Sequence, residues 1–312
     1  MAAVTTAKET VSFKKDFTRV QRDIAASQKI HRESMSYAQG VIRTLKQNKV
    51  AMVSLGFILF LILVAVFGPL IFPDYEKQDL LNTLQAPSLK HLLGTDELGR
   101  DVLTRLIRGT RISLFIGFAA ETINLVVGII YGGIAGFLGG KADNIMMRII
   151  DVLMSVPQTL VMILMLTVLK RGMGTLILSL TVTGWIGLAR LVRGQILSLR
   201  ENEYAVAAKV LGAGKREILF NHLLPNTVGP IIVNYTMSIP GAIAAEAGMS
   251  YLGLGISVPE ASWGNMLQFG ASQFPATLWL FFAPAVLFAL SMLAFNLLGD
   301  GLRDALDPKM RR

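Results

Sequence analysis

Several kinds of residue are missing or scarce in this chain of 312 residues, and each shortage excludes a class of chemistry. There is no cysteine, which excludes disulfides, thiolate metal sites and cysteine nucleophiles. The three histidines, His31, His91 and His222, lie far apart in polar contexts and lack the spacing of metal ligands. No serine occupies a nucleophile elbow. The sequence therefore predicts neither a catalytic site nor a metal site.

A phosphate-binding loop is missing as well. Residues 211–216 read Leu-Gly-Ala-Gly-Lys-Arg and look like such a loop at first sight. In the pattern G-x-x-x-x-G-K-[ST], however, the first glycine would fall on Lys209, and Arg216 replaces the hydroxyl residue that binds magnesium. We therefore expect no cofactor on this chain and no hydrolysis of ATP by it, so the chain is not expected to be an enzyme.

Charged residues are also scarce. Only 16% of the chain is charged, whereas 53% is hydrophobic. This balance is unusual for a soluble domain. It arises from six apolar stretches, each long enough to cross the roughly 30 Å hydrocarbon core of a bilayer as a helix. The stretches are 50–72, 112–138, 145–169, 172–188, 227–254 and 277–298. The sequence therefore predicts an all-α membrane protein with six transmembrane helices.

The net charge of +9 is explained by this class without a nucleic acid partner. Lys and Arg concentrate on the cytoplasmic side of membrane spans. Residues 1–49 form a basic arm that lacks the apolar core and cleavage site of a signal peptide. We therefore place this arm and the tail 299–312 in the cytoplasm. Residues 73–111 then form an extracytoplasmic loop, and 112–298 form a core of five spans. The basic residues also suit contact with anionic membrane lipid.

Two features of the spans concern helix packing. Gly128, Gly132, Gly136 and Gly140 recur at intervals of four residues. They predict a continuous stripe where another helix can approach closely. Pro157 lies within the third span and predicts a bend there, because proline removes one helical hydrogen bond. Neither feature requires a ligand.

Two acidic residues, Glu121 and Glu246, lie inside predicted spans. A carboxylate at mid-membrane costs about 2.5–3.5 kcal/mol, so each must face protein or water rather than lipid. We interpret Glu121 as a packing partner. For Glu246 two interpretations stay open, a role in the translocation path or its gate, and a structural hydrogen bond near the outer surface. The candidate path residues beside Glu246 on the fifth span are Tyr235, Ser238, Ala242 and Met249.

The longest charged interval in the second half of the chain, residues 203–225, separates the fourth and fifth spans. Some of its residues recur at three- and four-residue spacing, so they share one face of a short helix. They are Tyr204, Ala207, Ala208 and Leu211. Gly212 follows where a residue in the left-handed conformation would end this helix. A short helix that ends at a glycine and lies between two spans is suited to binding by a partner protein outside the membrane. An ordinary interfacial helix is the alternative.

The same stretch resembles the EAA motif of bacterial ABC-importer permeases, in which it forms the coupling helix that docks into the ATPase subunit. The resemblance is carried by Ala207-Ala208, by Gly212, and by Leu224-Pro225 at the end of a fixed spacer. The match is partial. Val206 stands at the position of the motif's glutamate, with Glu203 one turn earlier, and His222 stands at its isoleucine. The displaced acid is similar to what peptide-permease subunits show.

Three further motifs resemble those of dipeptide and oligopeptide permeases. They are G-T-D-x-x-G-R-D at 94–101, E-x-x-x-S-Y-L-G-L-G followed by W-G at 246–264, and G-D-G-L-R-D-A-L-D-P at 299–308. With these motifs in order, the resemblance covers residues 90–312. From its residues alone, the first motif would be a turn in which Asp96 caps a short helix.

This resemblance implies a type I importer fold in the bacterial inner membrane and the role of the C-type permease subunit in an ATP-driven dipeptide or oligopeptide importer. It also implies the partners: a B-type permease subunit, two ATPase subunits that carry ATP and magnesium, and an extracytoplasmic peptide-binding protein. The residues expected to couple this chain to the ATPases are Glu203, Tyr204, Ala207, Ala208, Leu211, Gly212, Lys215, Arg216, Leu224 and Pro225.

Two alternatives remain at this stage. Permeases for nickel or another small solute share the same motifs, so the solute stays open. A secondary transporter working alone is the competing class. It would need an internal repeat and coupling-ion carboxylates at broken helices near the midplane, and two scattered acids support it only weakly.

Overall fold

A computed structural model of the chain describes residues 37–306. For Tyr37 and Lys215 it describes the backbone only. Most of the predicted arm and the last residues of the predicted tail lie outside this range. The chain divides into two compact units, Met1–Gln39 and Gly40–Arg312. All sites below lie in the second unit.

The described residues are almost entirely helical. Their helices are α3 (Tyr37–Gln47), α4 (Lys49–Ile71), α5 (Val102–Leu138), α6 (Gly140–Met154), α7 (Gln158–Val168), α8 (Met173–Leu199), α9 (Glu203–Val210), α10 (Lys215–Glu217), the π-helix η1 (Ile218–Leu223), α11 (Leu224–Tyr251), α12 (Trp263–Ser272) and α13 (Leu278–Leu306). Within the described range, the one β-type pairing is an isolated bridge between Thr95 and Asp101. The all-α prediction is confirmed.

Five helical segments are long and apolar enough to cross a membrane: α4, α5, α8, η1 with α11, and α13. The pair α6 and α7 meets the same test together and is bent by 70° at Ser155–Pro157, which is the geometry of a broken span or of a re-entrant loop. Five to six candidate spans agree with the six predicted, and the bend at Pro157 is confirmed. The second span begins earlier than predicted, because α5 starts at Val102, ten residues before Ile112. Asp101 caps this early start by accepting a hydrogen bond from the Thr104 N–H.

The predicted glycine stripe lies where α5 packs against α8. A Cβ atom at Gly132 would overlap the carbonyl group of Ala189, and one at Gly136 would lie 2.9 Å from the carbonyl oxygen of Arg193. Gly128 likewise faces Leu188. Only glycine allows two helix backbones to come this close. Gly140 does not belong to the stripe, because it begins α6 with φ +57° and no atom lies within 4 Å of its Cβ position.

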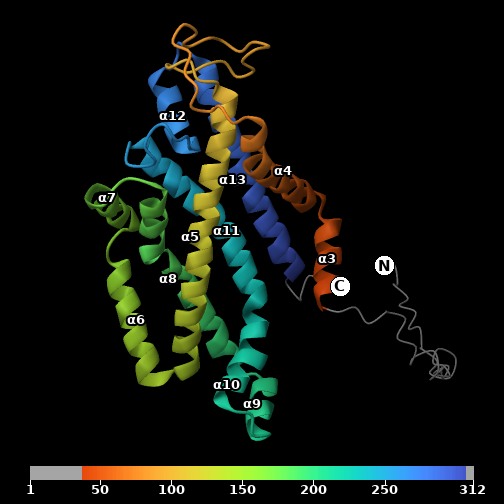
Figure 1. Ribbon diagram of the computed structural model, residues 1–312. Coiled ribbons are helices and arrows are strands. Elements are labelled where there is room, and N and C mark those ends of the chain that lie inside the picture. The colour runs from red at the N-terminus through yellow and green to blue at the C-terminus, as the bar shows by residue number, and fades with distance from the viewer. Residues whose placement is uncertain (1–36, 307–312) are drawn as a thin grey trace, which may run out of the picture. The chain divides into compact units, whose positions relative to one another are not determined.

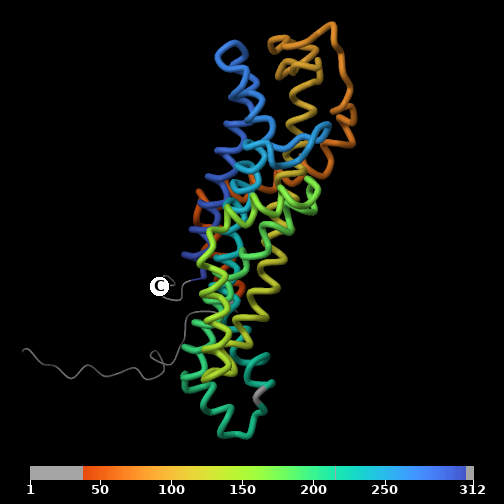
Figure 2. Tube along the Cα trace, turned by 90° about the vertical axis from the view of Figure 1, so that its left-hand side faces the viewer, coloured from red at the N-terminus to blue at the C-terminus, as the bar shows by residue number. Residues whose placement is uncertain are grey.

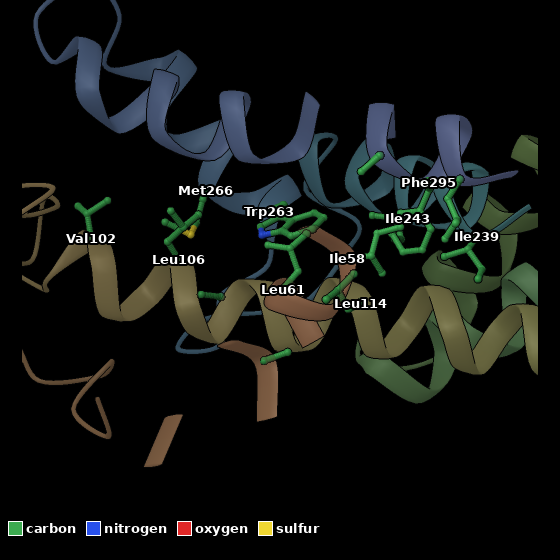
Figure 3. Close-up of a cluster of buried hydrophobic side chains, with 14 of the residues drawn as sticks. Ile58, Leu61, Val102, Leu106, Leu114, Ile239, Ile243, Trp263, Met266 and Phe295 are labelled. Carbon is green, nitrogen blue, oxygen red and sulfur yellow. The ribbon is translucent and has the colours of Figure 1, made fainter. Parts of the chain in front are cut away.

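A second packing centre joins α4, α5, α11, α12 and α13. Its buried side chains include Leu61, Leu114, Ile243, Trp263 and Phe295, and Figure 3 shows Trp263 near the middle of the cluster. This packing also explains part of the 299–308 motif. A Cβ at Gly301 would collide with the side chain of Ala51 on α4, and one at Gly299 would collide with Met237 on α11. The two glycines therefore let α13 approach both neighbours.

The two ends of the bundle carry different structures, as Figures 1 and 2 show. At one end, the segment 72–101 and helix α12 cover the beginning of α5. At the opposite end, α9 and α10 project between α8 and α11. The two ends hold different candidate sites.

Candidate functional site

Helix α9 begins at Glu203 and ends where the sequence predicted. Gly212 has φ +89°, a conformation that costs other residues about 1–2 kcal/mol. The N–H of Gly212 donates to the Lys209 carbonyl (3.1 Å), and the N–H of Ala213 donates to the Ala208 carbonyl (3.0 Å). These two bonds make a Schellman motif, which satisfies the last carbonyls of the helix. The predicted left-handed stop is confirmed.

One alanine holds α9 on the bundle. Ala205 is buried in a cluster with Val192 and Ile196 of α8 and Leu223 of η1. The residues on the other faces have no such cover. Tyr204, Val206, Ala207, Val210 and Leu211 are all exposed, with 87% of Leu211 accessible. The face predicted from the spacing of 204, 207 and 211 therefore points outward, and Ala208 is half-buried beside it.

The segment that follows α9 returns the chain to the bundle. Residues Ile218–Leu223 form a π-helix, and the Leu224 N–H donates to the Leu219 carbonyl five residues earlier. This wider turn leads directly to Pro225 near the start of α11, where a missing N–H costs little. Leu224 packs on the cluster that holds Ala205, and Pro225 is exposed.

The charged side chains of this segment that the structure describes are exposed. Glu203 lies in the first turn of α9, where a negative charge is favourable next to the helix N-terminus. The guanidinium group of Arg216 lies 5.9 Å from the centre of the Phe220 ring. The side chain of Lys215 lies outside the described structure. Within the described residues, Glu203 and Arg216 make no ion pair with each other.

Glu246 is fully buried, and it joins three helices. Its carboxylate accepts hydrogen bonds from the hydroxyl of Ser113 on α5 (2.9 Å) and from that of Ser250 on α11 (2.7 Å). The Ser113 hydroxyl in turn accepts one from the N–H of Trp263 on α12 (3.1 Å). Gly264 packs against the Ala247 backbone. The E-x-x-x-S and W-G motifs therefore form one packed joint, and this geometry favours the structural interpretation of Glu246. Its role in a path stays a prediction.

The other candidate path residues do not share one exposed surface. Ala242 and Met249 are buried. The Ser238 hydroxyl donates to the Asn234 carbonyl of its own helix (2.8 Å). The Tyr235 hydroxyl lies 3.0 Å from that of Thr122 on α5, at the protein surface. Thr122 was missed by the sequence analysis, because nothing local marks a threonine as the neighbour of a tyrosine 113 residues away.

Glu121 is the second acidic residue within a span. Its carboxylate accepts a hydrogen bond from the Asn124 side chain (3.2 Å). Asn124 is buried, and a Cβ at Gly184 of α8 would overlap its amide group. This contact agrees with the interpretation of Glu121 and its neighbours as packing partners between α5 and α8.

The motif at 94–101 builds a folded loop around Asp96. One carboxylate oxygen of Asp96 accepts hydrogen bonds from the N–H groups of Leu98 and Arg100, both at 2.9 Å. The other accepts one from the Nε of Arg100 (2.7 Å) and lies 3.5 Å from the Nε of Arg105. Asp96 therefore holds a buried ion-pair cluster and caps no helix. The predicted cap was wrong by five residues, because Asp101 is the N-cap of α5.

The two motif glycines explain the shape of this loop. Gly94 and Gly99 have φ +75° and φ +68°, and a Cβ at Gly99 would overlap the Asp79 carbonyl. Two contacts then fasten the loop region to its surroundings. The Nδ1 of His91 lies 2.9 Å from the carboxylate of Asp101, and Thr95 bonds to the backbone of residues 82 and 85.

Arg108 ties α5 to the segment before α12. Its guanidinium group makes two hydrogen bonds to the carboxylate of Glu260, at 2.9 and 2.8 Å. It also lies 4.7 Å from the centre of the Tyr75 ring. Burial is the largest cause that raises the pKa of Tyr75 to about 12, so its hydroxyl stays neutral at physiological pH. The sequence analysis missed this group, since Arg108 and Glu260 are separated by 152 residues.

Comparison with known proteins agrees with this geometry. Residues 128–312 match the family described as the binding-protein-dependent transport system inner membrane component, and residues 36–87 match the N-terminal TM domain of oligopeptide transport permease C. The dipeptide transport system permease protein DppC of Bacillus subtilis is 51% identical over 288 residues, which cover 91% of this chain and 89% of that protein.

Two further relatives are oligopeptide permeases. The oligopeptide transport system permease protein OppC of Bacillus subtilis is 46% identical over 287 residues, 92% of this chain and 94% of that protein. The protein of the same name from Haemophilus influenzae is 41% identical over 282 residues, 89% and 91% of the two chains. The chain therefore belongs to the family of binding-protein-dependent transport system inner membrane components.

Proposed function

We propose that this chain is the C-type transmembrane permease subunit of an ATP-driven importer of dipeptides or oligopeptides. The names of its relatives support the substrate class. In this proposal a B-type permease subunit completes the translocation path, two ATPase subunits dock at the α9 end, and an extracytoplasmic binding protein delivers the peptide at the other end. ATP and magnesium belong to the ATPases. The α9 end is then cytoplasmic, as are both termini.

The observation that carries the proposal is the unpartnered outer surface of α9. The helix is held by one buried alanine, and its outward face exposes Tyr204, Ala207 and Leu211. Apolar side chains exposed outside the membrane mark a docking surface for another protein. Ala207 contributes almost no bulk there, so the backbone of α9 can approach a partner closely.

The same geometry supplies a mechanical link. η1 connects α9 to α11, and Ala205 connects it to α8, so a partner that moves α9 also displaces the ends of two spans. A partner shifts a two-state protein only by its different affinity for the two states. We therefore expect the ATPases to bind α9 more tightly in one state of the importer than in the other.

The test is a pair of substitutions at one exposed site. Ala207→Trp adds a bulky side chain where the chain itself leaves space, so folding and membrane level should stay normal. ATPase co-purification and peptide uptake should fall together, because the indole separates the two subunits. Ala207→Ser keeps the small size and is the matched control. If Ala207→Trp binds the ATPases and supports uptake as the wild type does, this segment does not couple them.

The translocation path is a finer part of the proposal. Tyr235 of α11 and Thr122 of α5 place two hydroxyl groups together at the surface, which suits a wet path shared with the partner permease. Tyr235→Phe should lower uptake without loss of assembly. Unchanged uptake would argue against a path at this surface.

The transported solute is tested separately. Nickel and other small-solute importers share these motifs, and the binding protein does most of the selection. Mass spectrometry of the ligand that co-purifies with the assembled importer should identify peptides. A chelated metal in their place would keep the permease assignment and overturn the peptide assignment.

A further inference from the structure

A cavity of about 180 Å³ lies beside the Asp96 cluster, at the end of the bundle opposite α9. Its wall combines the loop that precedes α5, the first turns of α5, helix α12 and the start of α13. Arg100 and Arg105 supply its positive charges, and Met266, Phe269 and Leu280 supply apolar surface. Ligand sites for drug-sized molecules usually measure about 300–1,000 Å³, so this cavity suits a smaller ligand.

The buried charges of this wall do not balance. Arg100 and Arg105 are both buried, and both face the single carboxylate of Asp96. The two oxygens of that carboxylate already contact two backbone N–H groups and two guanidinium groups. The buried part of the wall therefore carries one unit of excess positive charge.

Hydrogen-bond donors remain available on these arginines. Arg105 uses Nη1 to donate to the Pro259 carbonyl (3.1 Å). Arg100 uses Nε for Asp96, and within the described residues its two Nη groups make no hydrogen bond. A guanidinium group presents two parallel N–H groups that match a carboxylate. The interior of the cavity is thus suited to a carboxylate.

The mouth of the cavity carries negative charge, whereas its interior carries positive charge. Glu97 and Gln268 line it and are exposed. Glu97 makes no ion pair within the described part of the chain. Its charge would repel a ligand with two negative charges, such as phosphate, and would attract an ammonium group next to the bound carboxylate. The apolar side chains of Met266, Phe269 and Leu280 leave room for one small apolar side chain.

We propose that this cavity binds the α-carboxylate end of a small zwitterion, a free amino acid or the last residue of a short peptide. The carboxylate lies on Arg100, and the side chain packs on Met266, Phe269 and Leu280. The ammonium group of a free amino acid faces Glu97, where the last residue of a peptide presents only its amide N–H. The site is separate from the Tyr235 surface and from α9.

The test uses the full chain in lipid nanodiscs without ATP, with binding followed by ligand-observed NMR titration. The ligands are L-leucine, L-leucinamide, which lacks the carboxylate, 4-methylpentanoate, which lacks the ammonium group, and glycyl-L-leucine. We expect L-leucine to bind at least about tenfold more tightly than L-leucinamide, because only the acid pairs with Arg100. Tighter binding of glycyl-L-leucine than of L-leucine would identify a peptide end as the ligand, and weaker binding would identify a free amino acid.

Two variants at the mouth avoid the buried ion pairs. Glu97→Gln should weaken L-leucine several-fold, because its ammonium group loses a partner, and should not weaken 4-methylpentanoate, which has no ammonium group and is relieved of repulsion by Glu97. Gln268→Trp should block all ligands by filling the mouth. The matched controls are Asp74→Asn, an exposed acid of the same segment outside the cavity, and Ser272→Trp, an exposed position one turn further along α12. Both should bind as the wild type does.

Three results would overturn the proposal: no saturable binding of L-leucine, equal affinity for L-leucinamide, or wild-type affinity in Gln268→Trp. Because the assay involves neither ATP nor transport, each of these results would leave the proposed importer function untouched. A loss of ATPase coupling in Ala207→Trp would likewise say nothing about the cavity.

Discussion

The two ends of the bundle hold their shape in different ways. One lobe, residues 73–101 with 256–262, packs on the first turns of α5 and is called the outer lobe because the proposed function places it outside the cell. It takes part in the Asp96 ion-pair cluster, the Arg108–Glu260 pair and the His91–Asp101 contact. In residues 203–225, the segment proposed to couple this chain to the ATPases and called the coupling segment below, helix α9 rests on one buried alanine, Ala205, and ends in the backbone bonds of a Schellman motif. The other apolar side chains of α9 and its C-cap, Tyr204, Val206, Val210 and Leu211, are exposed.

This difference shows what each end needs. The outer lobe pairs its buried carboxylate, Asp96, with arginine side chains of the same chain, because an unpaired buried charge is costly, and so it can keep a fixed shape in the absence of a partner. The coupling segment leaves apolar surface open, and that surface is stabilised only when another protein covers it. The contrast predicts that substitutions in the lobe chiefly change stability, whereas substitutions on the coupling segment chiefly change binding.

The largest effect is expected for Asp96→Ala in the outer lobe. The change leaves two buried guanidinium groups without their carboxylate, which should destabilise the chain by about 3–5 kcal/mol. Thermal unfolding of the purified chain in nanodiscs measures this loss. Asp74→Asn removes an exposed charge from the same lobe and should unfold as the wild type does. A stable Asp96→Ala protein would mean that the lobe does not depend on its ion pairs.

A smaller loss of stability is expected for Ala205→Trp, at the buried side of α9. The indole cannot fit beside Val192 and Ile196, and overpacking of this kind costs about 1–3 kcal/mol. Ala207→Trp, two residues away on the exposed side, should unfold at the temperature of the wild type. The same scan of thermal unfolding compares both. Equal losses in the two variants would contradict the assignment of an inner and an outer face to α9.

Gly212→Val should have a local effect. The left-handed conformation costs a β-branched residue about 1–2 kcal/mol, while the space around the Cβ position is open. Hydrogen exchange should show faster exchange of the Gly212 and Ala213 amides, and ATPase co-purification should fall. Gly214→Val is the control, because Gly214 is also open but has no positive φ. If both variants bind the ATPases equally well, the glycine stop is not needed for docking.

The smallest effect is expected for Asp79→Asn at the surface of the outer lobe. The Asn82 side chain donates to Asp79 (2.7 Å) and is the largest cause that lowers the pKa of this carboxylate. A lowered pKa contributes stability above the unfolded value of about 3.9, and the contribution disappears as the pH falls through the folded value. The small difference in melting temperature between wild type and Asp79→Asn should therefore shrink on acidification. A difference that grows at low pH would contradict this assignment.

Much of the coupling segment could be predicted from the sequence, because its structure is local. The spacing of Tyr204, Ala207 and Leu211 defines one face within two helical turns, and Gly212 ends the helix through its own φ angle. The burial of Ala205 could not be predicted, since the spacing alone does not say which face of an amphipathic helix meets the bundle.

The structure of the outer lobe was predicted poorly, because it depends on contacts between residues that are distant in the sequence. Asp96 and Asp101 lie five residues apart, and both precede a helix, so local rules do not decide which one caps it. The choice depends on Arg105, because its guanidinium group lies beside the carboxylate of Asp96 and engages it in an ion pair. The pairing of Arg108 with Glu260 and the cavity beside Arg100 likewise depend on segments that meet only after α12 has packed on α5.

The sequence by itself determined the class of the protein, its long apolar helices, the bend at Pro157, the close α5 contact at Gly132 and the stop at Gly212. Each follows from hydrophobic length, residue spacing or backbone freedom, which act within a few turns of the chain. Only the tertiary structure decided that Glu246 closes a joint with Ser113 and Trp263, and that Arg100 lines a cavity. The bond between Ser113 and Trp263 joins residues 150 positions apart, and such contacts are determined by how whole helices pack.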